Sequence, residues 1–548
     1  MSPADKRSAT TSAVSLALGD VAGQAVEAHA PELAREHFAQ RLAGRDADLW
    51  GEAAVEEASK RLGWVDLPTT SRELVGDILD LKEELAGEGI HRVVLCGMGG
   101  SSLAPEVITA TDDVPLVVLD GTDPGQVERA MSTELQRTVV VVSSKSGSTV
   151  ETDSQRRAFE KAFTDAGIDA ASRIVVVIDP GSPLEKEATS AGYRMVFTAD
   201  PQVGGRYSAL TAFGLVPSGL AGADIRGLLE QAADVAPSLA VDGPDNPALR
   251  LGSALGGTDP LRDKIVIVDD GSGLVGFGDW AEQLLAESTG KEGTGLLPVV
   301  VRSDDAPELQ GGPADDVLVV RLVGSAGTAD PGPAEVAVSG SLGGQMQLWE
   351  TVTAVAGRLL GINPFDQPDV ESAKKAARGL LDQQPKPSAP DFTDGGIEVR
   401  ATDGLLEGAD TLESALQALL DRIDPQRGYL AVMAYLDREA DSELADIRQP
   451  LARRSGRPVT FGWGPRFLHS TGQYHKGGPP TGVYLQVTAD ASSDVDVPDR
   501  PFTFGRLIAA QAAGDAQVLA EHGRPVLRLH LPDRVAGIQR LLSVARGK

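Results

Sequence analysis

The stretch VVVVSSKSGSTVET, residues 139–152, decides the fold class of this chain. Its four consecutive valines form a continuous apolar run, which is typical of a strand buried on both faces of a parallel sheet. A hydroxyl-rich loop, Ser143–Thr149, follows the run, and a helix-like segment follows the loop. A strand, a loop and a helix in this order form the repeating unit of α/β proteins.

Short β-branched runs of the same kind occur on both sides of this stretch. In the first region they are Val93–Cys96, Leu116–Leu119, Ile174–Ile178 and Met195–Phe197. Because helix-like segments separate them, they predict one parallel sheet in a first α/β domain, residues 86–225. Runs between Lys264 and Leu322 predict a second α/β domain, residues 226–382.

The two ends of the chain have different patterns. Residues 1–85 are rich in alanine and amphipathic, which predicts a helical N-terminal arm. After the Pro-rich segment Gln383–Pro390, strands and helices alternate again. This pattern predicts a C-terminal α/β extension, residues 393–548, that either forms a third layer or enlarges the second sheet.

Composition restricts the classes of partner. The 548 residues carry a net charge of −29, from 79 acidic and 50 basic side chains. This acidity argues against nucleic acid or anionic membranes as partners. The single cysteine, Cys96, lies in an apolar run and is expected to be buried, and no apolar stretch reaches the roughly 20 residues of a membrane span. With no convincing secretion signal, we expect the cytoplasm as the location.

The loop after the valine run has the composition of a phosphate site. Residues 143–149 include four serines, one threonine and one lysine. A phosphate monoester carries about two negative charges and several acceptor oxygens, which such a cluster of donors would bind. The alternative is a polar turn with Thr149 as the N-cap of the next helix, but capping needs only one hydroxyl.

A second loop, Gly97–Ser102, also follows a strand and precedes a helix. Its glycines could let backbone N–H groups face an anion, or could serve only a tight turn that packing requires. It lacks the glycine spacing of dinucleotide-binding turns. Both loops are expected at the carboxyl ends of parallel strands, where open α/β sheets bind ligands.

Together these loops resemble a known pair of signatures. GMGGSSLAP (97–105) and SSKSGSTVET (143–152) look like those of the sugar-isomerase domain family, in particular the glucose-6-phosphate isomerases. Three further motifs resemble the family's in the same order: GGRYS (204–208), ESTGK (287–291) and FDQPDVESAK (365–374). The resemblance implies two doubly wound parallel-sheet sugar-isomerase domains, a sugar-phosphate substrate, aldose–ketose isomerisation through an enediol, and a possible homodimer.

The resemblance also implies roles for individual residues. Glu287 would be the base that moves a proton between C1 and C2, and Arg206 would stabilise charge on the enediolate. Without the motif, Glu287 would be read as a solvated helix-end carboxylate and Arg206 as part of a structural salt bridge. Lys374 would assist ring opening. The phosphate would be bound by Ser101, Ser144, Lys145, Ser146 and Thr149, and the sugar hydroxyls by Glu151 and Gln367. Gly100 and Ser148 are further expected substrate-binding residues.

The family's ring-opening histidine is missing from its expected place, because no histidine lies between Glu287 and Lys374. The candidate is His469, in the segment PRFLHSTGQ (465–473), with His475 as a second candidate and a structural histidine as the alternative. This segment resembles one in the isomerase half of bacterial transaldolase–isomerase fusions. Two further departures are Asp369, where the family has glycine, and Gly147, which replaces a bulkier residue.

Three other functions compete with this interpretation. A bifunctional enzyme would also accept mannose 6-phosphate, and a non-catalytic sugar-phosphate sensor would share the phosphate loops without needing Glu287, Arg206 or Lys374. A transaldolase needs a barrel of eight strand–helix units, for which the sequence before Val93 is too short. No metal-binding motif is found, and an enediol route through these side chains needs no metal or organic cofactor.

Overall fold

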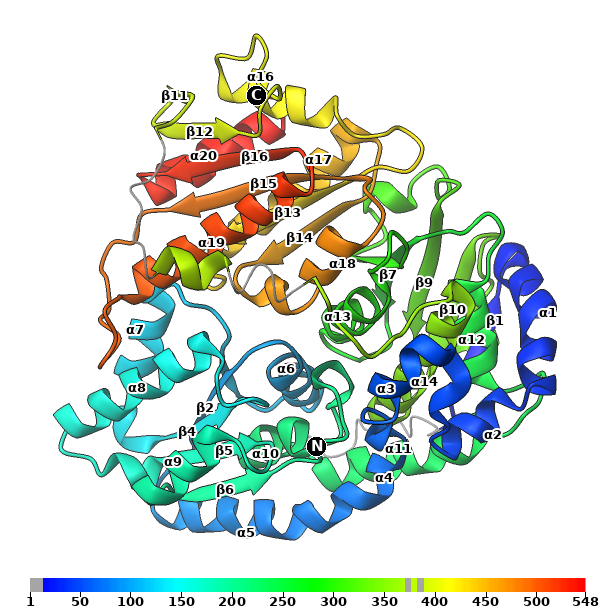
Figure 1. Ribbon diagram of the computed structural model, residues 1–548, viewed down its shortest axis with the longest axis horizontal. Coiled ribbons are helices and arrows are strands. Elements are labelled where there is room, and N and C mark those ends of the chain that lie inside the picture. Colours follow the sequence, from blue (N-terminus) through cyan, green and yellow to red (C-terminus); the bar gives the residue numbers. More distant parts are fainter. Residues whose placement is uncertain (1–12, 370–375, 382–388, 548) are drawn as a thin grey trace, which may run out of the picture.

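The computed structural model describes residues 13–369, 376–381 and 389–547. Figure 1 shows three lobes, each built around one sheet, with the N-terminal helices along the outside of two of them. The expected α/β class with two parallel-sheet domains and a C-terminal extension is confirmed.

The first sheet contains five parallel strands in the order β3-β2-β4-β5-β6. The strands are β2 (Arg92–Gly97), β3 (Val117–Leu119), β4 (Thr138–Ser143), β5 (Ile174–Ile178) and β6 (Met195–Thr198). The helices are α6 (Leu103–Thr111), α7 (Pro124–Ser132), α8 (Val150–Asp165), α9 (Pro183–Ala191) and α10 (Ala212–Ala221). All five expected strands are present. The chain changes direction across the sheet between β2 and β4, which opens a crevice at their carboxyl ends.

The second sheet has the order β1-β10-β9-β7-β8. Its strands are β7 (Lys264–Asp270), β8 (Leu297–Val301), β9 (Val317–Val323), β10 (Glu335–Ser339) and β1 (Ser15–Leu18). Its helices are α11 (Ile225–Leu239), α12 (Pro247–Gly256), α13 (Phe277–Thr289) and α14 (Leu342–Leu360). Only β1 is antiparallel, pairing with β10. Neither β1 nor β10 was predicted, so the first 85 residues are not helical throughout.

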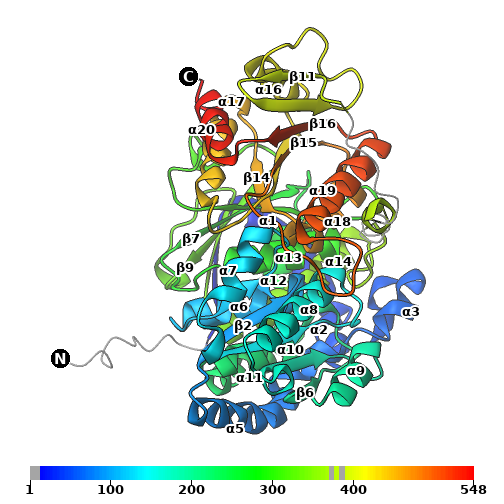
Figure 2. The same cartoon turned by 90° about the vertical axis from the view of Figure 1, so that its left-hand side faces the viewer.

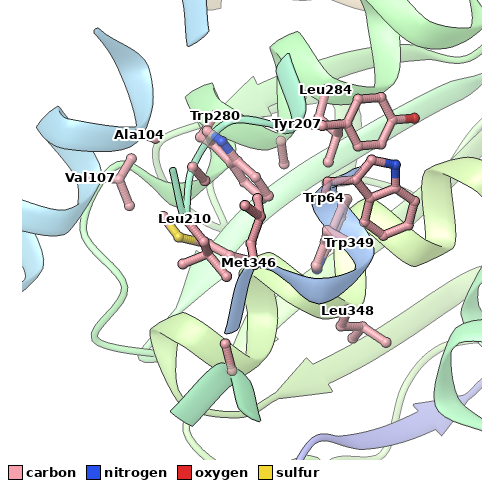
Figure 3. Packing of buried hydrophobic residues seen from close by; sticks show 14 of the residues in the cluster. Trp64, Ala104, Val107, Tyr207, Leu210, Trp280, Leu284, Met346, Leu348 and Trp349 are labelled. Atoms are coloured by element: carbon pink, nitrogen blue, oxygen red, sulfur yellow. The ribbon is translucent and has the colours of Figure 1, made fainter. Parts of the chain in front are cut away.

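The N-terminal helices pack into the same core as the first two sheets. They are α1 (Asp20–Arg35), α2 (Phe38–Ala43), α3 (Val55–Ala58), α4 (Leu67–Thr70) and α5 (Leu74–Gly87). Figure 3 shows Trp64 of this region beside Tyr207, and the two rings stack with centroids 5.2 Å apart. Trp280 and Trp349 belong to the same buried cluster. The arm is therefore an integral part of the core.

The C-terminal sheet is separate, in the order β11-β12-β16-β15-β13-β14. Its strands are β11 (Phe392–Asp394), β12 (Ile397–Ala401), β13 (Tyr429–Tyr435), β14 (Val459–Trp463), β15 (Gly482–Ala489) and β16 (Val526–Leu531). Its helices are α16 (Leu412–Leu420), α17 (Arg448–Ser455), α18 (Gly472–Gly477), α19 (Phe504–Glu521) and α20 (Arg534–Ala545). Of the two arrangements that the sequence left open, the structure has the third layer.

Shared apolar cores join this third lobe to the other two. Val299 of the second sheet and Tyr429 of the third belong to one buried cluster, and Phe504 of α19 packs in a cluster with Val140 of the first sheet. Figure 2 shows α19 alongside the body of the molecule. The expected burial of Cys96 is confirmed, and this burial raises the pKa of its thiol. None of the helices in the described ranges is long and apolar enough to cross a membrane.

Candidate active site

A cavity of about 860 Å³ lies at the carboxyl ends of β2 and β4, and residues from all three lobes line it. Its volume is within the range of ligand sites in proteins. Apart from the second histidine candidate, His475, thirteen candidate residues were named from the sequence, and twelve of them line it: Gly100, Ser101, Ser144, Lys145, Ser146, Ser148, Thr149, Glu151, Arg206, Glu287, Gln367 and His469. The thirteenth, Lys374, lies outside the described residues.

The hydroxyl groups of the Ser143–Thr149 loop bond to one another. Ser144 Oγ donates to Thr149 Oγ1 at 3.3 Å, and the Ser146 and Ser148 hydroxyls are 2.9 Å apart. Thr149 occupies the N-cap position of α8, but its side chain makes no capping bond. The capping alternative therefore does not account for this hydroxyl. The amino end of α8 adds a partial positive charge beside the loop.

Two cationic side chains line the cavity at the Ser143–Thr149 loop, one from the loop itself and one from outside it. Lys145 Nζ lies 2.5 Å from Asp179 Oδ2, and burial lowers the pKa of Lys145 even though Asp179 opposes this effect. Arg61, from the N-terminal arm, also lines the cavity and was not found from the sequence. Gly147 has a φ of +67°, and a Cβ there would lie 2.9 Å from Leu184 Cβ. This close contact explains why glycine replaces a larger residue.

The glycines of the Gly97–Ser102 loop permit close contacts with two other segments. A Cβ on Gly100 would lie 1.9 Å from the carbonyl oxygen of Gly205. Gly99 has a φ of +57°, and a Cβ there would lie 2.9 Å from His469 Cβ. Packing thus requires these two glycines, while Gly100 and Ser101 also face the cavity.

Glu287 lies on α13 and is 8% exposed. Its Oε1 is 3.2 Å from Arg206 Nη1, and its Oε2 accepts a hydrogen bond of 3.0 Å from Gln283 Nε2. The carboxylate is therefore held through both oxygens. Sequence reasoning missed Gln283, although its position four residues before Glu287 places the two on one helix face.

Arg206 is fully engaged by protein acceptors. Its Nε donates to Ser288, its Nη1 to Glu287 and Gln367, and its Nη2 to the carbonyl oxygens of Pro364 and Asp366. These bonds use all five donors of a guanidinium. Arg206 thus fixes both the carboxylate of Glu287 and the segment that carries Gln367.

Lys291, the lysine of the ESTGK motif, binds the same segment. Its Nζ donates to the carbonyl oxygens of Asn363 and Asp366 and to Asp366 Oδ1, at 2.6 to 2.7 Å. Burial and the nearby charge of Arg206 lower the pKa of Lys291 to about 8. Lys291 does not line the cavity and supports its wall.

His469 reaches the cavity from the C-terminal lobe. Its Nε2 lies 3.3 Å from Glu151 Oε1, and its carbonyl oxygen accepts a hydrogen bond of 2.7 Å from Gln283. Three residues earlier, Arg466 forms ion pairs with Glu106 and Asp120 at 2.6 and 2.8 Å. The segment that carries His469 is therefore anchored to the first lobe of the same chain.

The second histidine candidate lies elsewhere. His475 is 2% exposed, its Nδ1 is 3.0 Å from the Tyr429 hydroxyl, and it does not line the cavity. Burial and the neighbouring Lys476 hold the pKa of His475 well below its ordinary value. These contacts are those of a structural histidine.

Asp369 ties the Gln367 segment to α18. Its backbone N–H donates to Gln473 Oε1 at 3.0 Å, and Gln473 Nε2 donates to Asp369 Oδ2 at 2.7 Å. This residue, which departs from the family's glycine, thus joins the second lobe to the helix that follows His469.

The fold and the site together define a class. Paired loops at the carboxyl ends of β2 and β4, with a buried Arg–Glu pair across the cavity, are the features of a sugar-isomerase type of protein. Residues 80–237 match the family model described as phosphoglucose isomerase. The chain belongs to the glucose-6-phosphate isomerase family, as the similarity to its relatives shows.

Two relatives and two solved structures illustrate the similarity. The chain is 30% identical to the glucose-6-phosphate isomerase of Rubrobacter xylanophilus, over 57% of this chain and 87% of the relative. It is 32% identical to a probable glucose-6-phosphate isomerase of Haloarcula marismortui, over 55% and 83%. A hypothetical protein of Thermus thermophilus matches with a TM-score of 0.57 and 27% identity, covering 67% of this chain and all of that one. A Chlamydia trachomatis glucose-6-phosphate isomerase supports the fold, with a TM-score of 0.52 and 20% identity over 68% of this chain and 89% of that one.

Proposed function

We propose that this chain catalyses the reversible interconversion of glucose 6-phosphate and fructose 6-phosphate, and that it does so in the cytoplasm. The observation that carries the proposal is that Glu287, Arg206, His469 and the hydroxyl loop border one cavity. Family membership supports the same reaction.

In this proposal the Ser143–Thr149 loop, together with Gly100 and Ser101, binds the phosphate through hydroxyl and backbone donors. Glu151 and Gln367 contact the sugar hydroxyls. Glu287 removes the proton from C2 of the aldose and returns it to C1 of the enediol. His469 and Lys374 open the sugar ring before this transfer.

Arg206 has a positioning role in this scheme. Because its donors are engaged, it holds Glu287 and Gln367 in place and supplies a fixed positive charge near the enediolate. This function combines the two sequence-based interpretations of Arg206, catalytic charge and structural ion pair.

A direct assay tests the reaction. Purified protein is mixed with fructose 6-phosphate, and formation of glucose 6-phosphate is followed with a coupled dehydrogenase. We expect turnover without an added cofactor, while a folded protein that gives no turnover would contradict the proposal. Mannose 6-phosphate in a parallel arm tests the bifunctional alternative.

The non-catalytic sensor is disfavoured by a particular observation. A sensor needs the phosphate loop but not a buried carboxylate held through both oxygens, as Glu287 is. The residues that line the cavity, within the described ranges, come from all three lobes of this chain, and the homodimer that the family resemblance implies stays a prediction.

A further inference from the structure

We propose that Gln511, on the C-terminal helix α19, is a positioning residue. It holds the carboxylate of Glu151 in the orientation in which it contacts His469 for ring opening. This inference rests on the proposed function. It assigns a role in the reaction to a side chain outside all five sequence motifs.

Gln511 lies in the middle of α19 and is 3% exposed. Its Nε2 donates to Glu151 Oε1 at 2.6 Å, and its Oε1 accepts a hydrogen bond of 2.8 Å from Thr122 Oγ1. Thr122 follows β3 and is fully buried. Gln511 therefore bridges a first-lobe threonine and the carboxylate of Glu151.

The chemistry of the two partners fixes the orientation of the amide. An ionised carboxylate only accepts hydrogen bonds, so the NH₂ group of Gln511 must face Glu151. The amide oxygen then faces Thr122, whose hydroxyl can donate to it. The carboxylate thus selects the amide orientation, and the Thr122 hydroxyl satisfies the amide oxygen that this orientation turns toward it.

Glu151 Oε1 is the oxygen that both Gln511 and His469 approach, at 2.6 and 3.3 Å. Glu151 is 5% exposed, so a donor from the protein takes the place that water would have at the surface. A neutral amide fixes the direction of the carboxylate without neutralising its charge. The charge stays available to orient the His469 imidazole.

The test compares two substrates that differ in whether the ring must be opened. Fructose 6-phosphate closes a ring through its C5 hydroxyl, and 5-deoxyfructose 6-phosphate lacks that hydroxyl and stays open. Exchange of the C1 proton with deuterated water, followed by NMR, measures proton transfer on both. For Gln511→Met, similar in length but without a donor, we expect a loss on the order of 10-fold on fructose 6-phosphate. On the open substrate we expect a clearly smaller loss, which reflects only the weakened contact of Glu151 with the sugar hydroxyls, because the Glu287 contacts are untouched.

Two matched pairs of variants separate positioning from folding. Thr122→Val should reproduce the selective loss in weaker form, while Thr122→Ser, which keeps the hydroxyl, should restore normal exchange. Gln517→Met removes a similar bond of 2.8 Å, from Gln517 to Glu521 on the same helix, and should change neither substrate.

Equal losses on both substrates in Gln511→Met, or no loss on either, would overturn the inference. An unmodified protein that exchanges neither substrate would instead overturn the proposed function. The two failures are therefore distinguishable.

Discussion

Glu350 illustrates how a single buried residue can oppose stability. It lies on α14 with no exposed surface, and neither carboxyl oxygen has a hydrogen-bond partner among the described residues. Burial raises the pKa of Glu350 well above its ordinary value. The folded protein therefore retains a proton that the unfolded chain releases above about pH 4.3.

The folded-state pKa of Glu350 is raised, so this group lowers the free energy of unfolding as the pH rises above the unfolded-state pKa of about 4.3. The loss is about 1.4 kcal/mol per pH unit until the folded-state pKa is reached. Glu350→Met removes both the unsatisfied oxygens and the titration. We expect the variant to have a higher free energy of unfolding than the unmodified chain. The difference between the two should be larger at pH 8 than at pH 5. Urea denaturation at the two pH values measures this, and equal differences would show that Glu350 does not keep its proton.

Arg206 shows what a motif does and does not reveal about a residue. The GGRYS motif predicted that Arg206 belongs to the site. The five hydrogen bonds of its guanidinium could not be predicted, because their acceptors on α13 and in the 364–367 segment are far away in the sequence. Gln511 gave no signal at all, since a glutamine in an Ala-rich helix resembles any polar helix residue. Lys374 stays a prediction, because it lies outside the described residues.

Among the elements, strands β4 and β5 of the first sheet were predictable because each is a local apolar run buried on both faces. Strand β1 was not, because its four residues gain a partner only by pairing with distant β10. The position of the loop Gly97–Ser102 between a strand and a helix was predicted. Its contact through Gly99 with His469 was not, because that contact depends on how the third lobe packs.

That contact leads to a prediction for the glycine loop. In Gly99→Ala the new methyl carbon would lie 2.8 Å from Gln283 Nε2 and 2.9 Å from His469 Cβ. Both distances are too short, so the His469 segment must move. We expect a loss of isomerase activity on the order of 10²-fold, the cost typical of a displaced catalytic group. Steady-state kinetics with fructose 6-phosphate measure this loss.

Gly273→Ala is the matched control for this variant. Gly273 has a φ of +79° and no atom near its would-be Cβ, so it carries the backbone strain without the contact. Normal activity is expected there. A loss in both variants alike would assign the effect to strain and remove the role of the contact.

At the scale of the whole molecule, three lobes share their cores and close one cavity. The net charge of −29 disfavours an anionic substrate at long range, and the cavity counters it locally with Lys145, Arg61 and Arg206. The sequence predicted the first two lobes and left open whether the C-terminal extension forms a third one. Their packing around one site could not be predicted, because it depends on non-local contacts such as those of α19 with the first sheet.

We propose that this one cavity performs proton transfer through Glu287. The most direct measurement is exchange of the C1 proton of fructose 6-phosphate with deuterated water, comparing the unmodified chain with Glu287→Gln. Glu282→Gln, on the same helix but outside the cavity, is the control. We predict rapid exchange in the unmodified chain and the control, and exchange slower by about 10²- to 10⁴-fold in Glu287→Gln. Exchange at the unmodified rate in a folded Glu287→Gln variant would rule out proton transfer through Glu287.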